Sequence, residues 1–205
     1  MNDYIWYASY GSNISTDRFM CYIQGGKPEG ATRTYHGCED QTPPLDQKPI
    51  EIPHELYFAK NAKVWNGGGV CFINPNKNHK AETLGNMYLI NRQQFIEVVQ
   101  QENNAHKPTD INFERAKNQD SSVIKENSWY GNLLSLGEKD NAPIFTFTNE
   151  RYLSSEINPP NHHYLKTIVK GLLASHQLSQ SELEAYFLSK KGIDKTITAE
   201  VINQL

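Results

Sequence analysis

The run Tyr-Ala-Ser-Tyr-Gly-Ser-Asn-Ile at residues 7–14 constrains the fold more than any other stretch of the chain. Residues 4–10 are apolar and aromatic, which favours a β-strand, and the run stops at Gly11 before two small polar residues. The periodicity of residues 18–23 then predicts a helix. A strand that ends in Gly-Ser-Asn ahead of a helix leaves several backbone N–H groups unpaired, and such a turn attracts a carboxylate or a phosphate. An ordinary strand-to-helix turn without a ligand is the alternative interpretation.

The composition narrows the class of protein. A chain of 205 residues suits one large domain with a substantial core. The formal net charge of -3, without a block of like charges, disfavours a nucleic-acid partner. No apolar run approaches the roughly 20 residues of a membrane span, and the first residues lack the pattern of a secretory signal. The three cysteines are widely spaced, which favours a reduced, cytoplasmic setting over a disulfide framework: they are Cys21, Cys38 and Cys71.

The residue pattern predicts strands first and helices later, which favours an α+β fold around a mostly antiparallel or closed sheet. Strands rich in aromatic or branched residues are expected at residues 4–10, 55–59, 70–73, 84–90, 129–136 and 144–148. Helical periodicity is clearest at residues 92–102, 164–174 and 181–189. Ser179 and Glu182 predict a capping box for the last of these helices. Residues 27–53 and 103–128 predict long irregular connections.

One acidic residue lies on the apolar face of the helix predicted at residues 92–102. Phe95, Val98, Val99 and Glu102 follow each other at spacings of three, four and seven from the first, so they share one face. A carboxylate beside apolar packing loses hydration, which raises its pKa toward the range useful for proton transfer at neutral pH. The alternative is that Glu102, at the end of its helix, reaches water.

Three segments together resemble the γ-glutamylcyclotransferase-like family. Residues 7–14 resemble its Tyr-x-x-Tyr-Gly-Ser-Asn-Leu signature, and residues 85–90 with Glu102 resemble its Gly-x-x-Tyr-x-Ile segment and later glutamate. Residues 160–165, Pro-Asn-His-His-Tyr-Leu, are similar to its Pro-Ser-x-x-Tyr segment at the head of a late helix. Asn103 stands where the family usually has Gly, and Asn161 where Ser is common.

The resemblance implies an architecture. It covers roughly residues 4–178 and implies a small mixed β-barrel or a strongly curved sheet with flanking helices. We expect one domain of this type at residues 1–178. Residues 179–205 are expected to form a C-terminal helical extension packed on the same domain.

The resemblance also implies an activity. A γ-glutamyl amine or peptide would be cyclised to 5-oxoproline with release of the amine, and this reaction needs no cofactor. Glu102 would be the catalytic general acid/base. The residues implied in binding the small-molecule γ-glutamyl substrate are Tyr10, Gly11, Ser12, Asn13, Ile14, Ser15 and Tyr164.

Other functions stay open from the sequence. A related enzyme could act on another amine conjugate, such as a γ-glutamylated amino acid, polyamine or peptide. A catalytically silent small-molecule-binding or interaction domain of the same fold is the alternative from a different class. No metal is expected, because the pair His162–His163 lacks a second ligand pair at suitable spacing.

Overall fold

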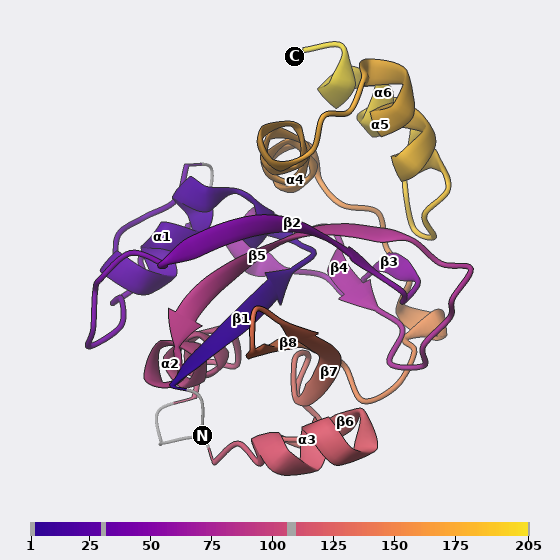
Figure 1. Cartoon of the computed structure of the whole chain (residues 1–205). Helices are drawn as coiled ribbons and strands as arrows, with labels where there is room; N and C mark the ends of the chain where they lie inside the picture. Colours follow the sequence, from indigo (N-terminus) through magenta and orange to yellow (C-terminus); the bar gives the residue numbers. More distant parts are fainter. Residues whose placement is uncertain (1–2, 30–31, 106–109, 205) are drawn as a thin grey trace.

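A six-stranded sheet forms the centre of the computed structural model, which describes residues 3–29, 32–105 and 110–204 (Figure 1). In spatial order its strands are β2 (Asp46–Ile52), β5 (Thr83–Asn91), β1 (Tyr4–Ser9), β8 (Ala142–Thr148), β7 (Asn132–Lys139) and β6 (Ser121–Val123). Neighbouring strands pair antiparallel, except that β1 and β8 are parallel. Strands β3 (Leu56–Ala59) and β4 (Val70–Ile73) form a separate antiparallel pair. The fold is therefore α+β with a mixed sheet, as the sequence predicted.

The closed barrel that the resemblance allowed is wrong. Within the described residues the sheet has two edges, β2 and β6, which do not pair with each other. Pro49 lies in β2 and has no N–H to donate, which suits an edge strand, and β6 is only three residues long. Figure 1 shows β2 and β5 bowed together across the molecule, so an open, curved sheet describes the architecture.

All six predicted strands occur, with ends shifted by up to three residues. Helix α2 (Arg92–Glu102) has the predicted bounds, and α1 (Thr16–Gln24), α4 (His162–Ser175) and α5 (Gln180–Leu188) contain most of the residues predicted for them. The capping box of Ser179 and Glu182 is confirmed. Helix α6 (Lys195–Ile202), which begins after an N-cap at Asp194, was not predicted.

The two segments predicted as irregular are more ordered than expected. Residues 27–53 contain β2, and residues 103–128 contain α3 (Phe113–Gln119) and β6. Residues 30–31 and 106–109 of these segments lie outside the described residues. Both extra strands lie at the edges of the sheet, where one side of a strand faces solvent and the sequence is accordingly polar.

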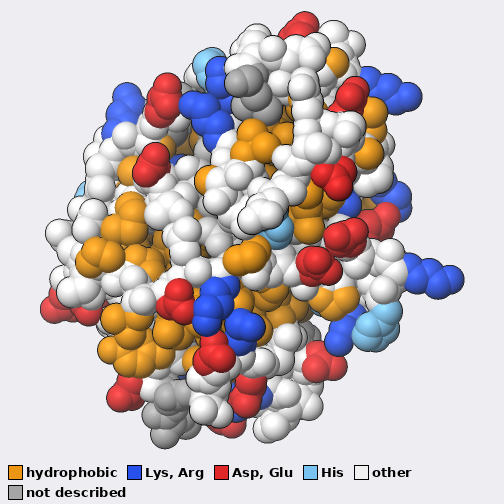
Figure 2. Space-filling model, turned by 45° about the horizontal axis from the view of Figure 1, so that its top comes forward, with side chains coloured by type: hydrophobic (Ala, Val, Ile, Leu, Met, Phe, Trp, Pro, Cys, Tyr) orange, Lys and Arg blue, Asp and Glu red, His pale blue; other side chains and the backbone are white. Residues whose placement is uncertain are grey.

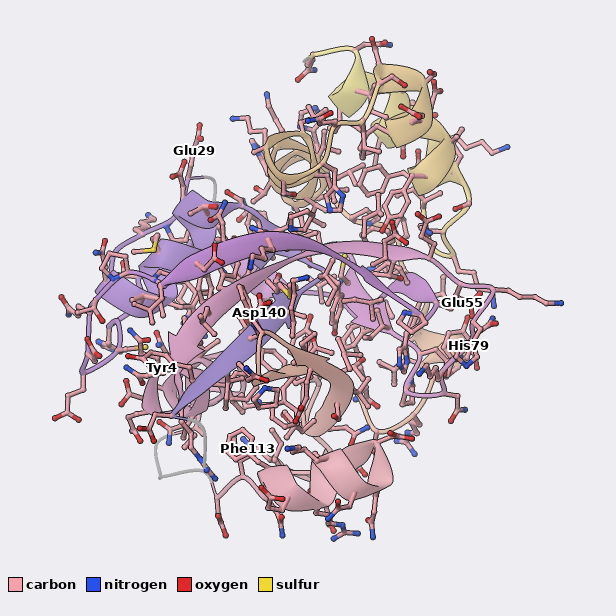
Figure 3. All side chains as sticks on the ribbon, viewed as in Figure 1. Tyr4, Glu29, Glu55, His79, Phe113 and Asp140 are labelled. Carbon is pink, nitrogen blue, oxygen red and sulfur yellow. The ribbon has the colours of Figure 1, made fainter. Side chains whose placement is uncertain are left out.

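Strand β1 is buried on both faces. Trp6 and Ala8 belong to the same apolar cluster as Leu165 of α4, whereas Ile5 and Tyr7 belong to the cluster on the other side of the sheet. That second cluster also contains side chains of α1, α2 and α3, including Phe113, which lies between α3 and the sheet (Figure 3). Successive residues of a strand point to opposite faces, which explains the uninterrupted apolar run of β1.

The C-terminal helices pack on the rest of the chain. Phe187 of α5 and Val201 of α6 are fully buried in the same cluster as Leu165. The hydroxyl of Tyr186 accepts a hydrogen bond of 3.0 Å from the backbone N–H of Leu84 in β5. Among the described helices, none is long and apolar enough to span a membrane. Charged side chains of both signs are interspersed over the face seen in Figure 2.

Candidate active site

A cavity of about 490 Å³ lies where the end of β1, the short helix η1 (Ser12–Ile14), the C-terminal end of α2 and the start of α4 meet. Its wall combines aromatic rings with a few polar and charged groups, which is typical of small-molecule sites. The charged residues of the wall are Arg18, Arg33, Lys63 and Glu102. The other lining residues are Tyr7, Ser9, Tyr10, Gly11, Ser12, Asn13, Tyr22, Thr32, Tyr35, Ala62, Val64, Trp65, Val70, Cys71, Asn104, Trp129, Tyr130, Phe147 and Tyr164.

Helix α2 directs Glu102 into this cavity. The helix begins with a capping box formed by Asn91 and Gln94, which fixes its first turn. Val98 and Val99 are fully buried, and Glu102 follows them on the same face at spacings of four and three. The predicted apolar face is therefore confirmed. Glu102, the last residue on this face of α2, lines the cavity, whereas the apolar residues before it pack in the core.

The surroundings of Glu102 favour a carboxyl group that holds its proton more tightly than usual. Burial raises the pKa of Glu102, while the Arg18 guanidinium and hydrogen bonding by Tyr22 and Asn13 partly oppose that rise. The Nδ2 of Asn13 donates a hydrogen bond of 2.9 Å to Oε1 of Glu102. The direction agrees with the one expected from the sequence, and a raised pKa is what a carboxyl group that both takes and returns a proton needs.

Residues Gly11, Ser12 and Asn13 form a turn that we call the amide cup. Its carbonyl groups are engaged, because the Gly11 oxygen accepts from Ile14 N at 3.0 Å and the Asn13 oxygen accepts from the Tyr88 hydroxyl at 2.9 Å. Within the described residues, the backbone N–H groups of Ser12 and Asn13 have no hydrogen-bond acceptor. The Oδ1 atom of Asn13 is buried without a partner. Unengaged N–H groups beside a cavity are the arrangement on which the sequence-based prediction of an anion-binding turn depends, and that role stays a prediction.

Helix α4 closes one side of the cavity. Its N-cap, Asn161, accepts a hydrogen bond of 2.9 Å from the backbone N–H of Tyr164, so Asn replaces the Ser of the family pattern as a cap. The Tyr164 hydroxyl accepts a hydrogen bond of 3.0 Å from the backbone N–H of Cys71. Burial raises the pKa of the Cys71 thiol to about 12, so this cysteine is no thiolate nucleophile near neutral pH.

The structure gathers most of the residues that the sequence singled out. Tyr10, Gly11, Ser12, Asn13, Glu102 and Tyr164 line one cavity. Two others lie outside its wall. Ile14 is 1% exposed and packs in the core, and its carbonyl accepts a hydrogen bond from Tyr88. Ser15 lines a separate hollow between α1 and α4.

Sequence reasoning missed a cationic part of the wall. Arg18 is only 4% exposed, and its Nη2 donates to the Tyr35 hydroxyl at 2.6 Å and to the Tyr22 hydroxyl at 3.3 Å. Arg33 lies beside it, with its guanidinium carbon 4.7 Å from the centre of the Tyr35 ring. The sequence did contain a signal for Arg18, namely a charged residue on an apolar helix face, as for Glu102. Arg18 precedes Phe19 and lies one helical turn before Tyr22.

The turn after Glu102 also depends on distant residues. Asn103 is buried, and its Nδ2 donates to the carbonyl groups of Val99 and Tyr130 at 3.0 and 3.1 Å. Asn104 follows in the left-handed conformation, with φ of 47°. An amide side chain and a left-handed asparagine therefore end α2 here, where the family usually has glycine after the glutamate.

The α+β fold of this chain is similar to the folds of solved proteins. A solved γ-glutamyl cyclotransferase superposes with a TM-score of 0.53 at 14% identity, over 98% of this chain and 99% of that one. An uncharacterized protein from Homo sapiens superposes with a TM-score of 0.53 at 16% identity, over the same shares of the two chains. These likenesses show that the chain has the γ-glutamyl cyclotransferase fold.

A comparison of this sequence with those of known proteins finds a relative that is not named as a cyclotransferase. The chain is 37% identical over 209 aligned residues to histone deacetylase 5 of Arabidopsis thaliana. The match covers 95% of this chain but spans only 31% of that protein, so the name of the whole relative says nothing about the activity of the matched part. No family model matches the chain. Among the described residues, no group of three or more His, Cys, Asp or Glu is arranged to hold a metal ion.

Proposed function

We propose that this chain is a γ-glutamylcyclotransferase-type enzyme that converts a γ-glutamyl amine or peptide into 5-oxoproline and the free amine. One observation carries the proposal: the amide cup and Glu102, 89 residues apart in sequence, line the same cavity and are joined by the Asn13–Glu102 hydrogen bond. The fold shared with γ-glutamyl cyclotransferases supports it.

The proposed reaction is intramolecular. The α-amino group of the substrate attacks its own γ-carbonyl carbon, a C–N bond closes the five-membered ring, and the bond to the leaving amine breaks. An ammonium group cannot attack, so Glu102 first takes one proton from it. After the attack the ring nitrogen loses a second proton, and both protons pass by way of Glu102 to the departing nitrogen, which leaves as an ammonium group. General acid–base catalysis of this kind contributes about 10²- to 10⁴-fold in rate. No atom is added, so the reaction needs no cofactor or metal.

The remaining residues hold the substrate for ring closure. The free N–H groups of the amide cup bind the α-carboxylate, and they or the Tyr164 hydroxyl stabilise the oxyanion that forms on the γ-carbonyl. Tyr10 supports the cup, because its hydroxyl donates to the carbonyl of Phe147 at 2.7 Å. Ile14 and Ser15 act through the backbone that carries the cup. Holding a flexible chain in a reactive shape reduces the entropy that ring closure would otherwise cost.

The organisation of the chain fits the same proposal. We propose that residues 1–178 form the catalytic domain and that 179–205 are an extension packed on it, since α5 and α6 share the apolar cluster of α4. The three cysteines are all free, which favours a reducing, cytoplasmic compartment.

The test is release of 5-oxoproline from a panel of γ-glutamyl amino acids, γ-glutamyl amines and glutathione. Turnover of at least one compound supports the proposal and identifies the released amine. Binding of panel members without any 5-oxoproline would instead support a catalytically silent small-molecule-binding domain of the same fold.

A further inference from the structure

A cation without an ion pair is buried beside the proposed catalytic carboxyl group. Arg18 of α1 is 4% exposed, and its guanidinium carbon lies 4.9, 4.5 and 5.6 Å from the ring centres of Tyr22, Tyr35 and Trp65. No ion pair within the described residues includes Arg18. A guanidinium group stays charged at all relevant pH values, and a buried charge without a partner is costly. An apolar side chain would fill this place at lower cost, which indicates that the charge itself has a function.

Arg18 is joined to two tyrosine hydroxyl groups. Its Nη2 atom donates a hydrogen bond of 2.6 Å to Tyr35 and one of 3.3 Å to Tyr22, and the two hydroxyl oxygens are 3.3 Å apart. Nη2 thus occupies an acceptor position on each hydroxyl group, and the hydroxyl protons point away from the guanidinium group. Arg18 therefore restricts the directions in which Tyr22 donates.

The hydroxyl of Tyr22 also hydrogen-bonds with the carboxyl group of Glu102. A carboxylate is a stronger acceptor than a neutral hydroxyl, so the ionised Glu102 takes the proton of Tyr22 in preference to Tyr35. Burial and the charge of Glu102 raise the pKa of Tyr22, so this hydroxyl stays protonated and remains a donor near neutral pH. The same two helices meet at a backbone group, because Nε2 of Gln101 in α2 donates to the carbonyl of Tyr22 in α1 at 2.9 Å.

Arg18 is the strongest of the influences that favour the ionised form of Glu102. Burial raises the pKa of Glu102, and the charge of Arg18 opposes that rise more than the hydrogen bonds of Tyr22 and Asn13 do. The other charged or titratable groups that interact with Glu102 come from the loop after α1, from β1, from the segment before β7 and from α4: Arg33, Tyr7, Tyr130 and Tyr164. Lys63 lines the same cavity wall.

We propose that Arg18 is a positioning residue that, through the hydroxyl of Tyr22, holds Glu102 as an oriented carboxylate ready to accept the proton of the substrate. The inference rests on the proposed function, which assigns this proton transfer to Glu102, and it adds two residues of α1 to the catalytic arrangement. Among the described residues no hydrogen bond joins Arg18 to Glu102 directly, so Tyr22 is the link between them.

The pH dependence of kcat/KM tests this role on the best panel substrate. Arg18→Met removes the charge that favours the carboxylate, so the acidic limb of the profile moves to higher pH by about one unit. On the acidic side kcat/KM then falls by about tenfold, and it recovers at higher pH. Arg18→Lys keeps the charge and rescues part of the shift. Lys170→Gln removes a half-exposed cation of α4 outside the cavity wall and leaves the limb at its wild-type position.

The variant Tyr22→Phe tests the link. It should move the acidic limb in the same direction as Arg18→Met, by less. In a Tyr22→Phe protein, Arg18→Met should shift the limb less than it does in the wild type, because the hydroxyl that Arg18 orients is gone. Equal shifts in the two backgrounds overturn the action through Tyr22. A folded Arg18→Met variant whose limb superimposes on the wild type overturns the whole inference, since Arg18 would then be structural. Should Arg18→Met fail to fold, Arg18→Lys and Tyr22→Phe decide by the same criterion.

Titration of Glu102 separates this inference from the proposed function, because it needs no substrate. NMR of protein with isotope-labelled glutamate carboxyl groups follows ionisation directly, and the signal missing from Glu102→Gln identifies Glu102. A higher pKa of Glu102 in Arg18→Met and Tyr22→Phe than in the wild type supports the inference. That result holds even where no panel compound releases 5-oxoproline, which contradicts the function. An unchanged pKa of Glu102 in both variants overturns the inference and leaves the function standing.

Discussion

The side-chain amide of Asn13 donates a hydrogen bond of 2.9 Å to the carboxyl group of Glu102, and this contact joins the first loop of the chain to the end of α2. Asn13 also donates to the hydroxyl of Tyr7 at 3.3 Å, while its own Oδ1 has no partner. The amide cup and the proposed proton carrier are thus parts of one polar group on the cavity wall.

Replacing Asn13 by Asp should shift the pH dependence of turnover. A second carboxylate beside Glu102 disfavours ionisation of the pair, which raises the pKa of Glu102 further. Glu102 must be ionised to accept a proton, so the acidic limb of the kcat/KM profile moves to higher pH. The measurement is a pH–rate profile on the best panel substrate. A profile for Asn13→Asp that superimposes on the wild type after scaling would contradict the contact between these two residues.

The raised pKa of Glu102 also predicts how stability depends on pH. The folded protein binds the Glu102 proton more tightly than the unfolded chain, so this group lowers the free energy of unfolding as pH rises from its ordinary value of 4.5 through the raised value. Glu102→Gln removes that cost. Urea unfolding should show the variant to be the more stable protein at pH 7, with a smaller difference at pH 4. A variant that is less stable at pH 7 would show that the carboxylate stabilises the fold.

Gly171 allows α4 to pack closely against the amide cup. A Cβ at this position would lie 2.6 Å from the backbone N of Ser15 and 2.8 Å from the carbonyl carbon of Ile14. Gly171→Ala should therefore destabilise the protein by about 1–3 kcal/mol and reduce turnover, because the cup must move. In an ordinary helix the same substitution stabilises by up to about 1 kcal/mol. Denaturant unfolding that shows this gain would contradict the tight contact.

The hydroxyl of Tyr164 has both a structural and a proposed substrate-binding role. Tyr164→Phe leaves the backbone N–H of Cys71 without its acceptor, which should cost about 1–3 kcal/mol of unfolding free energy. Tyr57→Phe is a matched control, because its hydroxyl accepts a hydrogen bond of 3.2 Å from Leu153 N outside the cavity. Both variants should lose stability, and only Tyr164→Phe should lose turnover. Equal turnover in the two variants would remove Tyr164 from the site.

The parts of the site that the sequence predicted are those fixed by local pattern. The spacing of Val98, Val99 and Glu102 within one helix places the carboxyl group on the apolar face without knowledge of any other element. The break from strand to turn at Gly11 is likewise local. The family resemblance then connected these two distant segments, which periodicity alone cannot do.

The parts that the sequence did not reveal depend on tertiary contacts. Arg18 is buried because Tyr35, which follows α1 in an irregular loop, covers it, and Arg33 is held by Asn104. Strand β2 was hidden by Pro49 and by its polar, alternating residues, which are tolerated because the strand lies at an edge and pairs only with β5. The prediction of a closed barrel was wrong because closure also depends on tertiary contacts. Within the described residues neither edge strand, β2 or β6, has a partner on its free side.

The most direct measurement of the central claim is the rate of 5-oxoproline release by Glu102→Gln, measured beside the wild type on the best panel substrate. Glu97→Gln is the control, because Glu97 belongs to the same helix, lies outside the cavity wall and accepts a hydrogen bond from Glu39 N. With folding of each protein verified by unfolding curves, we predict a loss of about 10²- to 10⁴-fold in kcat for Glu102→Gln and a rate near wild type for Glu97→Gln. A folded Glu102→Gln variant that releases 5-oxoproline at the wild-type rate would contradict the account.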